Sequence, residues 1–320
     1  MAFDFDAAVG APFRMQPGLR RLAPAALQLT PAAPGLPHMR EKLAVLSTFA
    51  SQALCSVAGC DAQAAIAATL ALAATEHPGT MQWDGEVASA LGVEVRAADG
   101  ALAQRARGRF GTGDEIARCL RALPAPWRLT GLLSLSMAED FALIDVDSGT
   151  IPWLAVALPS RWAPESKVGR HFAEVHAPVA DGDTLRRASA ALMLMVSGDT
   201  RWERFVWTIT DWPRLHAHPQ RAPHKSWLSF DPLQAWWRSE RQTFIPLPER
   251  RQAMFTIHVE VTPLAQALAA PGHAAGVHAA IASMTSAVLH YRGLQAVRDP
   301  LLEWLARTAA GDAPATSTAE

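Results

Sequence analysis

Glu240 is a candidate functional residue, because its carboxylate falls on the apolar face of a predicted helix. Asp231 suits a helix N-cap and Pro232 a first helical position, so residues 231–244 are predicted to be helical with a defined phase. With that phase, one stripe of the helix contains Leu233, Trp236, Trp237, Glu240 and Phe244. An unpaired charge on an apolar face is costly, so Glu240 needs a cation, a proton or a ligand. Two interpretations stay open: a structural ion pair with an arginine, and a pocket acid that receives a cationic substrate.

Two histidines, His171 and His176, lie five residues apart in the segment ALPSRWAPESKVGRHFAEVHAPV, residues 157–179. His176 stands just before the Ala177–Pro178 step, which favours an extended backbone there. A single histidine in such a place is either a satisfied core residue or a ligand. The residue pattern alone gives no reason to prefer the ligand.

Other histidines have simpler explanations. His216, His218 and His224 form a loop cluster that could hold a metal, but no carboxylate or cysteine lies at ligand spacing, and a solvated loop is expected. His258 is expected on the polar face of a strand with Glu260, where a cross-strand hydrogen bond would explain it.

Motifs for nucleophilic catalysis and nucleotide binding are missing. The sequence contains neither G-x-S-x-G nor H-E-x-x-H, and its G-T-G at 111–113 has no third glycine and no GK[ST]. The three cysteines, Cys55, Cys60 and Cys119, are too few for an iron–sulfur cluster held by four thiolates. Their odd number and spacing favour reduced thiols. Eleven tryptophans suit either a core or the walls around a flat cofactor.

Composition describes an ordinary globular chain. It has 320 residues, half of them hydrophobic and 18% charged, and a formal net charge of -1. Without a basic excess, nucleic acid is not expected as a partner. No secretory start and no apolar run long enough to span a membrane are seen, so we expect a cytoplasmic protein without a membrane partner.

The elements that must position these residues form an α+β pattern. A proline-rich arm at 11–37 precedes helices expected at 39–55, at 61–77 with Asp61 as N-cap, and within 110–124. Strands are expected within 132–146, 151–159, 204–212 and 253–261, and helices at 183–198, 231–244, 274–292 and 299–309. The last strand alternates apolar and polar residues, which predicts one buried and one polar face. A mainly antiparallel sheet with flanking N- and C-terminal helices follows.

Four sequence motifs favour the ligand interpretation of His176 and the pocket-acid interpretation of Glu240. LPSRWAPESKVGRHFAEVHAPV, RFVWTITD, WWRSERQTFIPLPERRQAMFTIHVEVTPL and HYRGL occur in that order. Together they resemble the signature blocks of the haem-dependent oxidative N-demethylase alpha-subunit family, over about residues 12 to 305. The resemblance implies a single PAS-like haem-binding domain over residues 1–310. The small, polar composition of residues 311–320 predicts a disordered tail. The resemblance also implies haem b, a small secondary amine, dioxygen, and electrons from a separate flavin and iron–sulfur reductase.

The resemblance also implies residue roles. His176 would be the axial iron ligand and Glu240 the pocket acid, the residue that the helix phase also selects. Arg204, Lys167 and Arg170 would be partners of the haem propionates. Trp162 would buttress a turn. Oxidation of an N-methyl carbon would release formaldehyde and the shortened amine.

Two departures from the family pattern bear on the substrate. Val206 replaces an amide, and Phe230 occupies the place of a pocket tyrosine. Tyr291 is the only tyrosine and belongs to a C-terminal helix, so no phenol is expected beside the iron. A larger amine, or N-hydroxylation of a biosynthetic amine, would then be favoured. A haem-binding PAS sensor without turnover, and a small-ligand binding module without haem, are the alternatives from other classes.

Overall fold

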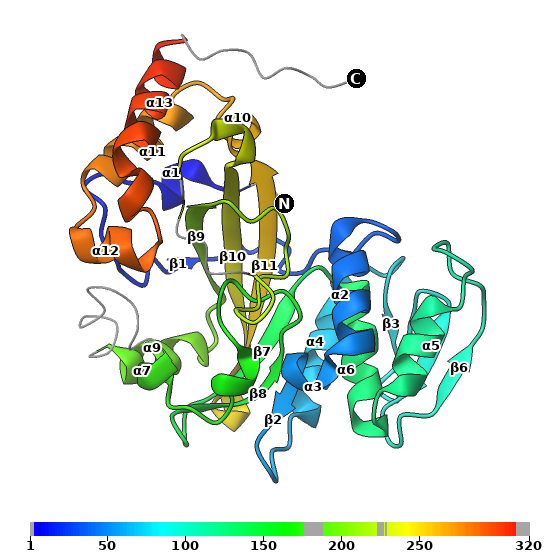
Figure 1. Cartoon of the computed structure of the whole chain (residues 1–320). Coiled ribbons are helices and arrows are strands. Elements are labelled where there is room, and N and C mark those ends of the chain that lie inside the picture. Colours follow the sequence, from blue (N-terminus) through cyan, green and yellow to red (C-terminus); the bar gives the residue numbers. More distant parts are fainter. Residues whose placement is uncertain (1–2, 176–187, 223–226, 228, 312–320) are drawn as a thin grey trace.

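The computed structural model describes residues 3–175, 188–222, 227 and 229–311. Its main sheet has seven strands in the order β1-β9-β10-β11-β7-β8-β2, and all its neighbouring pairs are antiparallel (Figure 1). The strands are β1 (Arg20–Arg21), β2 (Leu54–Ser56), β7 (Asp140–Asp145), β8 (Thr150–Ala155), β9 (Trp202–Thr210), β10 (Trp236–Leu247) and β11 (Gln252–Pro263). The predicted α+β class with a mainly antiparallel sheet is confirmed.

Residues 231–244 are not a helix, and this prediction is wrong. Asp231 does accept a hydrogen bond from the backbone N–H of Leu233, but it caps only the 3-10 turn η2 (Pro232–Gln234). The chain then enters β10, which lies between β9 and β11. Both faces of this central strand are largely buried, so it has no period-two alternation that would reveal a strand. The apolar stripe therefore does not exist, and Trp237 and Glu240 project to opposite faces of the sheet.

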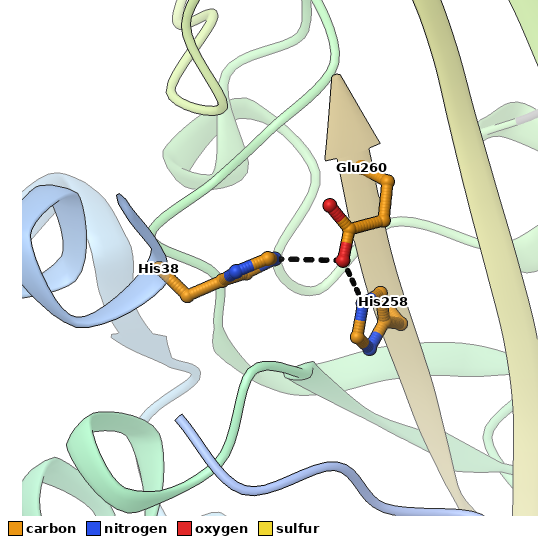
Figure 2. Close-up of side chains that lie close together, drawn as sticks. All are labelled: His38, His258 and Glu260. Carbon is orange, nitrogen blue, oxygen red and sulfur yellow. Dashed lines mark hydrogen bonds and ion pairs between the residues drawn. The ribbon is translucent and has the colours of Figure 1, made fainter. Parts of the chain in front are cut away.

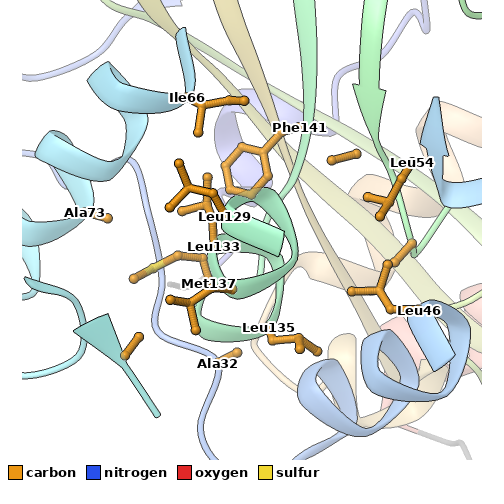
Figure 3. Packing of buried hydrophobic residues seen from close by; sticks show 14 of the residues in the cluster. Ala32, Leu46, Leu54, Ile66, Ala73, Leu129, Leu133, Leu135, Met137 and Phe141 are labelled. Atoms are coloured by element: carbon orange, nitrogen blue, oxygen red, sulfur yellow. The ribbon is translucent and has the colours of Figure 1, made fainter. Parts of the chain in front are cut away.

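One large core packs against the sheet from the side of the N-terminal helices. These helices are α2 (Pro37–Thr48), α3 (Ala50–Ala53), α4 (Gln63–Glu76), α5 (Glu115–Ala122) and α6 (Ala125–Ser136). Figure 3 shows Leu129 and Leu133 of α6 against Ile66 of α4 and Phe141 of β7. Residues 132–136 belong to α6, whereas a strand was predicted there, because a short continuous apolar run does not distinguish a buried helix from a buried strand.

The helix at α4 begins close to the predicted place. Its N-cap is Ala62, and the carboxylate of Asp61 accepts a hydrogen bond from the N–H of Gln63 at 3.0 Å. The expected Asp61 cap is therefore wrong by one position, although the carboxylate still serves the first turn.

A second sheet was not predicted. Its strands are β3 (Gln82–Trp83), β4 (Val87–Ala90), β5 (Val93–Arg96) and β6 (Leu102–Gln104), in the order β3-β4-β5-β6. Strands of two to four residues are too short to show a period. The turn at Gly92 has φ 76°, and a Cβ there would lie 2.6 Å from the carbonyl oxygen of Ala106, so the tight connection requires glycine.

The strand β11 is buried on both faces, which corrects the prediction of one polar face. Thr256 and His258, which lie on the predicted polar face, are only 0% and 6% exposed. The helix α4 packs against β10 and β11 and covers this face. Polar side chains on it are therefore expected to have hydrogen-bonding partners within the protein.

A second core lies at the other end of the main sheet, around the stacked rings of Trp207 and Trp237. The C-terminal helices α10 (Leu264–Ala267), α11 (His273–Ala282), α12 (Ser286–Tyr291) and α13 (Arg298–Ala310) pack here, together with α1 (Phe5–Ala8) (Figure 1). The predicted helix 274–292 is two helices, because Thr285 begins a new one by accepting a hydrogen bond from the N–H of Val288.

Three smaller features complete the described chain. The arm pairs with the sheet through β1, and an isolated bridge joins Pro31 to Met137. Between β8 and β9 lie η1 (Pro164–Ser166), α7 (Phe172–Val175) and α9 (Ser189–Val196); η3 (Pro248–Arg250) and η4 (Gln295–Val297) lie further along. Among the described residues, no helix is long and apolar enough to cross a membrane.

Candidate active site

Glu240 lies in the middle of β10 with a partly buried carboxylate. Its Oε1 accepts a hydrogen bond from the hydroxyl of Ser160, and its Oε2 accepts one from Nε2 of Gln242 at 2.6 Å. Within the described part of the chain, no lysine, arginine or histidine forms an ion pair with Glu240. This favours the pocket acid over the structural ion pair, because the carboxylate is held in place without being neutralised by direct contact.

Ser160 connects Glu240 to a buried arginine. Nε of Arg238 donates to the Ser160 hydroxyl at 2.8 Å, and its other nitrogens donate to the carbonyl oxygens of Arg214 and Leu215 at 3.0 and 2.7 Å. Burial lowers the pKa of Arg238 to about 10, against the opposing charge of Glu240. Arg238 remains a cation at neutral pH and fixes the serine hydroxyl that holds Glu240.

Arg204 lies on the same face of the sheet. It is the cross-strand partner of Gln242, and Val206 is the partner of Glu240. Nε of Arg204 is buried and has no hydrogen-bonding partner among the residues that the structure describes. Burial lowers the pKa of Arg204, and the charge of Glu240 opposes this shift. A buried guanidinium with an unused donor is suited to an anionic group.

Tyr291 lies at the end of α12, a helix whose Val288 and Leu289 belong to the second core. Burial raises the pKa of its phenol, and the charges of Glu240 and Arg204 are among those that act on it. The ring is 47% exposed and projects from α12. The phenol keeps its proton at neutral pH and can donate. The absence of a phenol beside the iron stays a prediction.

An apolar wall adjoins these polar groups. Phe244, two residues beyond Gln242 on the same face, stacks on Phe255 of β11 with ring centroids 5.0 Å apart. Phe255 also packs against a buried cluster that includes Ala142 of β7 and Leu154 of β8. Trp162, Val168, Phe172 and Val175, from the segment before β9, pack against the same cluster. The face thus passes from a polar part at Glu240 to a wall of flat and aliphatic side chains.

The other predicted site residues lie in different places. Lys167 donates to the carbonyl oxygen of Val175 at 3.4 Å, while Arg170 is exposed. Trp162 packs between the first core and the apolar wall. Phe230 packs near Trp227 and Trp304 in the second core, with both ring centroids 6.0 Å from its own. His176 lies outside the described residues and follows directly after α7.

The histidine loop is not solvated, which corrects another expectation. His216 and His218 are 9% and 1% exposed. Nδ1 of His216 bonds to the carbonyl oxygen of Ala157, and Nε2 of His218 lies 3.1 and 3.2 Å from the two carboxylate oxygens of Glu165. His224 lies outside the described residues.

Sequence reasoning missed the three residues that hold Glu240 in place. Arg238 and Gln242 lie two residues to either side of Glu240, and a period of two would have selected them if the segment had been assigned as a strand. Ser160 lies in the P-S-x-W block quoted above, but its contact with Glu240 joins positions 80 residues apart. No local pattern predicts such a contact.

Comparison with known families agrees with this geometry. The family model described as haem-dependent oxidative N-demethylase, alpha subunit-like, matches residues 119–302, more than half of the chain. The match includes β7 to β11, Ser160, Arg204, Glu240 and Tyr291. The chain belongs to the haem-dependent oxidative N-demethylase alpha subunit-like family.

Proposed function

We propose that this protein binds haem b and uses it to oxidise a small amine with dioxygen, with Glu240 as the anchor of the protonated amine. The observation that carries the anchor role is the state of the Glu240 carboxylate. It accepts hydrogen bonds from Ser160 and Gln242 and has no direct cationic partner in the described part of the chain. An ionised carboxylate has about four acceptor sites, so it can also accept N–H groups of a cationic amine.

The residues on this face fit a haem group. Arg204 offers an unused buried donor for a propionate, and the wall around Phe255 and Phe172 suits a flat apolar macrocycle. We propose that His176 would ligate the haem iron, since imidazole suits haem iron, and that Lys167 and Arg170 would be further partners of the propionates. The bound haem would supply the dioxygen chemistry. We also propose that β8-β7-β11-β10-β9 are the PAS-like part of the main sheet.

The protein's own groups then do the positioning. Glu240 binds the ammonium, and Arg238 and Ser160 keep its carboxylate from rotating, so that the amine is presented in one orientation. We propose N-demethylation, in which the methyl carbon leaves as formaldehyde, with N-hydroxylation of a biosynthetic amine as the alternative.

Electrons must come from outside the chain. Its three cysteines are free, and two of them, Cys55 and Cys119, are buried. Burial raises the pKa of Cys55 to about 11, with the charge of Glu165 adding to the effect, so this thiol stays protonated. We propose a separate flavin and iron–sulfur reductase as the donor, in agreement with an alpha subunit that has partner subunits.

Spectroscopy and product analysis together test this function. Protein supplied with haem should show a Soret band and, after reduction with dithionite and exposure to air with methylated amines, should release formaldehyde. Absence of the Soret band would contradict haem binding and leave a small-ligand module. Haem binding without any amine product under these conditions would favour a sensor.

A further inference from the structure

A second group of ligand-type side chains lies on the opposite face of the sheet from Glu240. Glu240 pairs with Val259 across β10 and β11, so His258 and Glu260 project to the other side. Figure 2 shows them facing His38, which comes from the first turn of α2. The group is therefore separate from the proposed amine site.

The three side chains already converge on one point. Nε2 of His258 is 2.8 Å from Oε1 of Glu260, and Nε2 of His38 is 3.8 Å from the same oxygen. One ligand atom from each residue lies within 4.8 Å of the others. Zinc bonds to nitrogen and oxygen are about 2.0–2.2 Å long, which places tetrahedral ligand atoms about 3.3 Å apart. Only small side-chain movements separate the observed arrangement from a metal site.

A buried carboxylate supports His258 from behind. Nδ1 of His258 lies 2.9 Å from Oε1 of Glu139, which is 1% exposed. The other oxygen of Glu139 accepts a hydrogen bond from the N–H of Thr30 at 3.0 Å, so the carboxylate is fixed. With Nδ1 held by Glu139, Nε2 is the nitrogen that faces Glu260 and could coordinate an ion, as in histidine ligands of metals that donate their other N–H to a carboxylate.

Charge and access also suit a cation. Two carboxylates, Glu139 and Glu260, flank one imidazole. Two carboxylates beside one imidazole attract positive charge to this position. The Glu260 side chain is 45% exposed, which gives an ion a path from solvent.

We propose that His38, His258 and Glu260 bind a divalent transition-metal ion, with zinc as its probe, and that Glu139 orients His258. Two nitrogens and one carboxylate oxygen match the ligand preference of zinc, with a fourth position left for water. Without an ion, Nε2 of His258 is hydrogen-bonded to Glu260, and Nε2 of His38 is hydrogen-bonded to the carbonyl oxygen of Val259 at 2.7 Å. The ion would take the place of the proton in each of these two hydrogen bonds. It would join α2 to β11.

Zinc binding to the haem-loaded protein tests this proposal. After chelation and buffer exchange, titration calorimetry with zinc should show one site per chain, and elemental analysis should count zinc separately from haem iron. His38→Gln and Glu260→Gln should each weaken zinc binding at least about tenfold, since even outer-shell changes cost roughly 10–100-fold. Zinc should raise the unfolding midpoint of the unaltered protein but not that of the two variants.

His77→Gln is the matched control. Nε2 of His77 bonds to the carbonyl oxygen of Leu29 at 2.8 Å, outside the cluster, so this variant should bind zinc like the unaltered protein. The proposal is overturned if the unaltered protein binds no zinc. It is equally overturned if both cluster variants, folded by circular dichroism, bind zinc as tightly as the control.

Discussion

Ser160 donates its hydroxyl hydrogen to the carboxylate of Glu240, across the 80 residues of chain that separate them. The same hydroxyl accepts a hydrogen bond from Nε of Arg238. A buried cation thus acts on the pocket acid through one neutral group and does not neutralise it by direct contact. The two hydrogen bonds from Ser160 and Gln242 fix the orientation of the carboxylate.

Ser160→Ala should weaken amine binding without loss of haem. The substitution removes one hydrogen bond to Glu240 and the acceptor of Arg238 Nε, a change of about 1–2 kcal/mol, or roughly tenfold in the dissociation constant. Spectral titration with a methylated amine measures it. Ser166→Ala is the control and should bind normally, because among the described residues the Ser166 hydroxyl bonds only to the carbonyl oxygen of Ala163. Equal affinity in the two variants would show that Ser160 does not position the acid.

Arg204→Met should affect the haem-free and haem-loaded proteins in opposite directions. Removal of a buried guanidinium with an unused donor should stabilise the haem-free protein by about 1–2 kcal/mol, whereas haem should bind more weakly. Denaturant unfolding and haem titration measure the two effects. Arg298→Met, at an exposed pair with Asp299, should change neither. A variant with unchanged haem affinity would remove Arg204 from the propionate site.

His176→Ala should abolish stable haem binding, because the proposed axial bond is lost. Loss of the Soret band after gel filtration is the measurement. His171→Ala is the control, because it also replaces a histidine by alanine, five residues earlier and at an exposed position. This variant should retain haem. If the two variants keep equal amounts of haem, the ligand is another residue.

Lys42→Met should destabilise the fold by about 3–5 kcal/mol, because it leaves a buried carboxylate without its cation. Nζ of Lys42 is fully buried, donates to the carbonyl oxygens of Met137 and Glu139, and lies 3.3 Å from Oδ1 of Asp140. Urea unfolding measures the change. Arg40→Met, on the exposed face of the same helix, should stay within about 0.5 kcal/mol of the unaltered protein. A similar small effect at Lys42 would contradict the buried pair.

The sequence predicts the strands that have strong β propensity and short flanking turns, but not the strand that carries the acid. β9 and β11 are rich in β-branched and aromatic residues, and both were expected close to their observed places. β10 was not, because Asp231 and Pro232 are real helix-start signals that open only one turn. Pairing with two neighbouring strands then overrides the local preference, and no window of sequence contains that information.

The candidate site was likewise predicted only in part, because most of its contacts join residues far apart in the sequence. Glu240 was selected for an incorrect reason, an apolar helix stripe, and now depends on its contacts and on the family match. Ser160 reaches it from the segment after β8, 80 residues earlier in the chain, and this approach results from packing between distant elements. The cluster of His38, His258 and Glu260 likewise joins a helix to a strand more than 200 residues later. Such sites are visible only after folding.

The central claim is that Glu240 anchors a protonated amine beside haem. Its most direct test is titration of the ferric haem spectrum with a panel of methylated amines, comparing the unaltered protein, Glu240→Gln and the exposed control Glu249→Gln. Loss of a charged hydrogen bond predicts amine binding about 10- to 100-fold weaker in Glu240→Gln alone, with the haem content unchanged. Equal amine affinity in all three proteins would contradict the account.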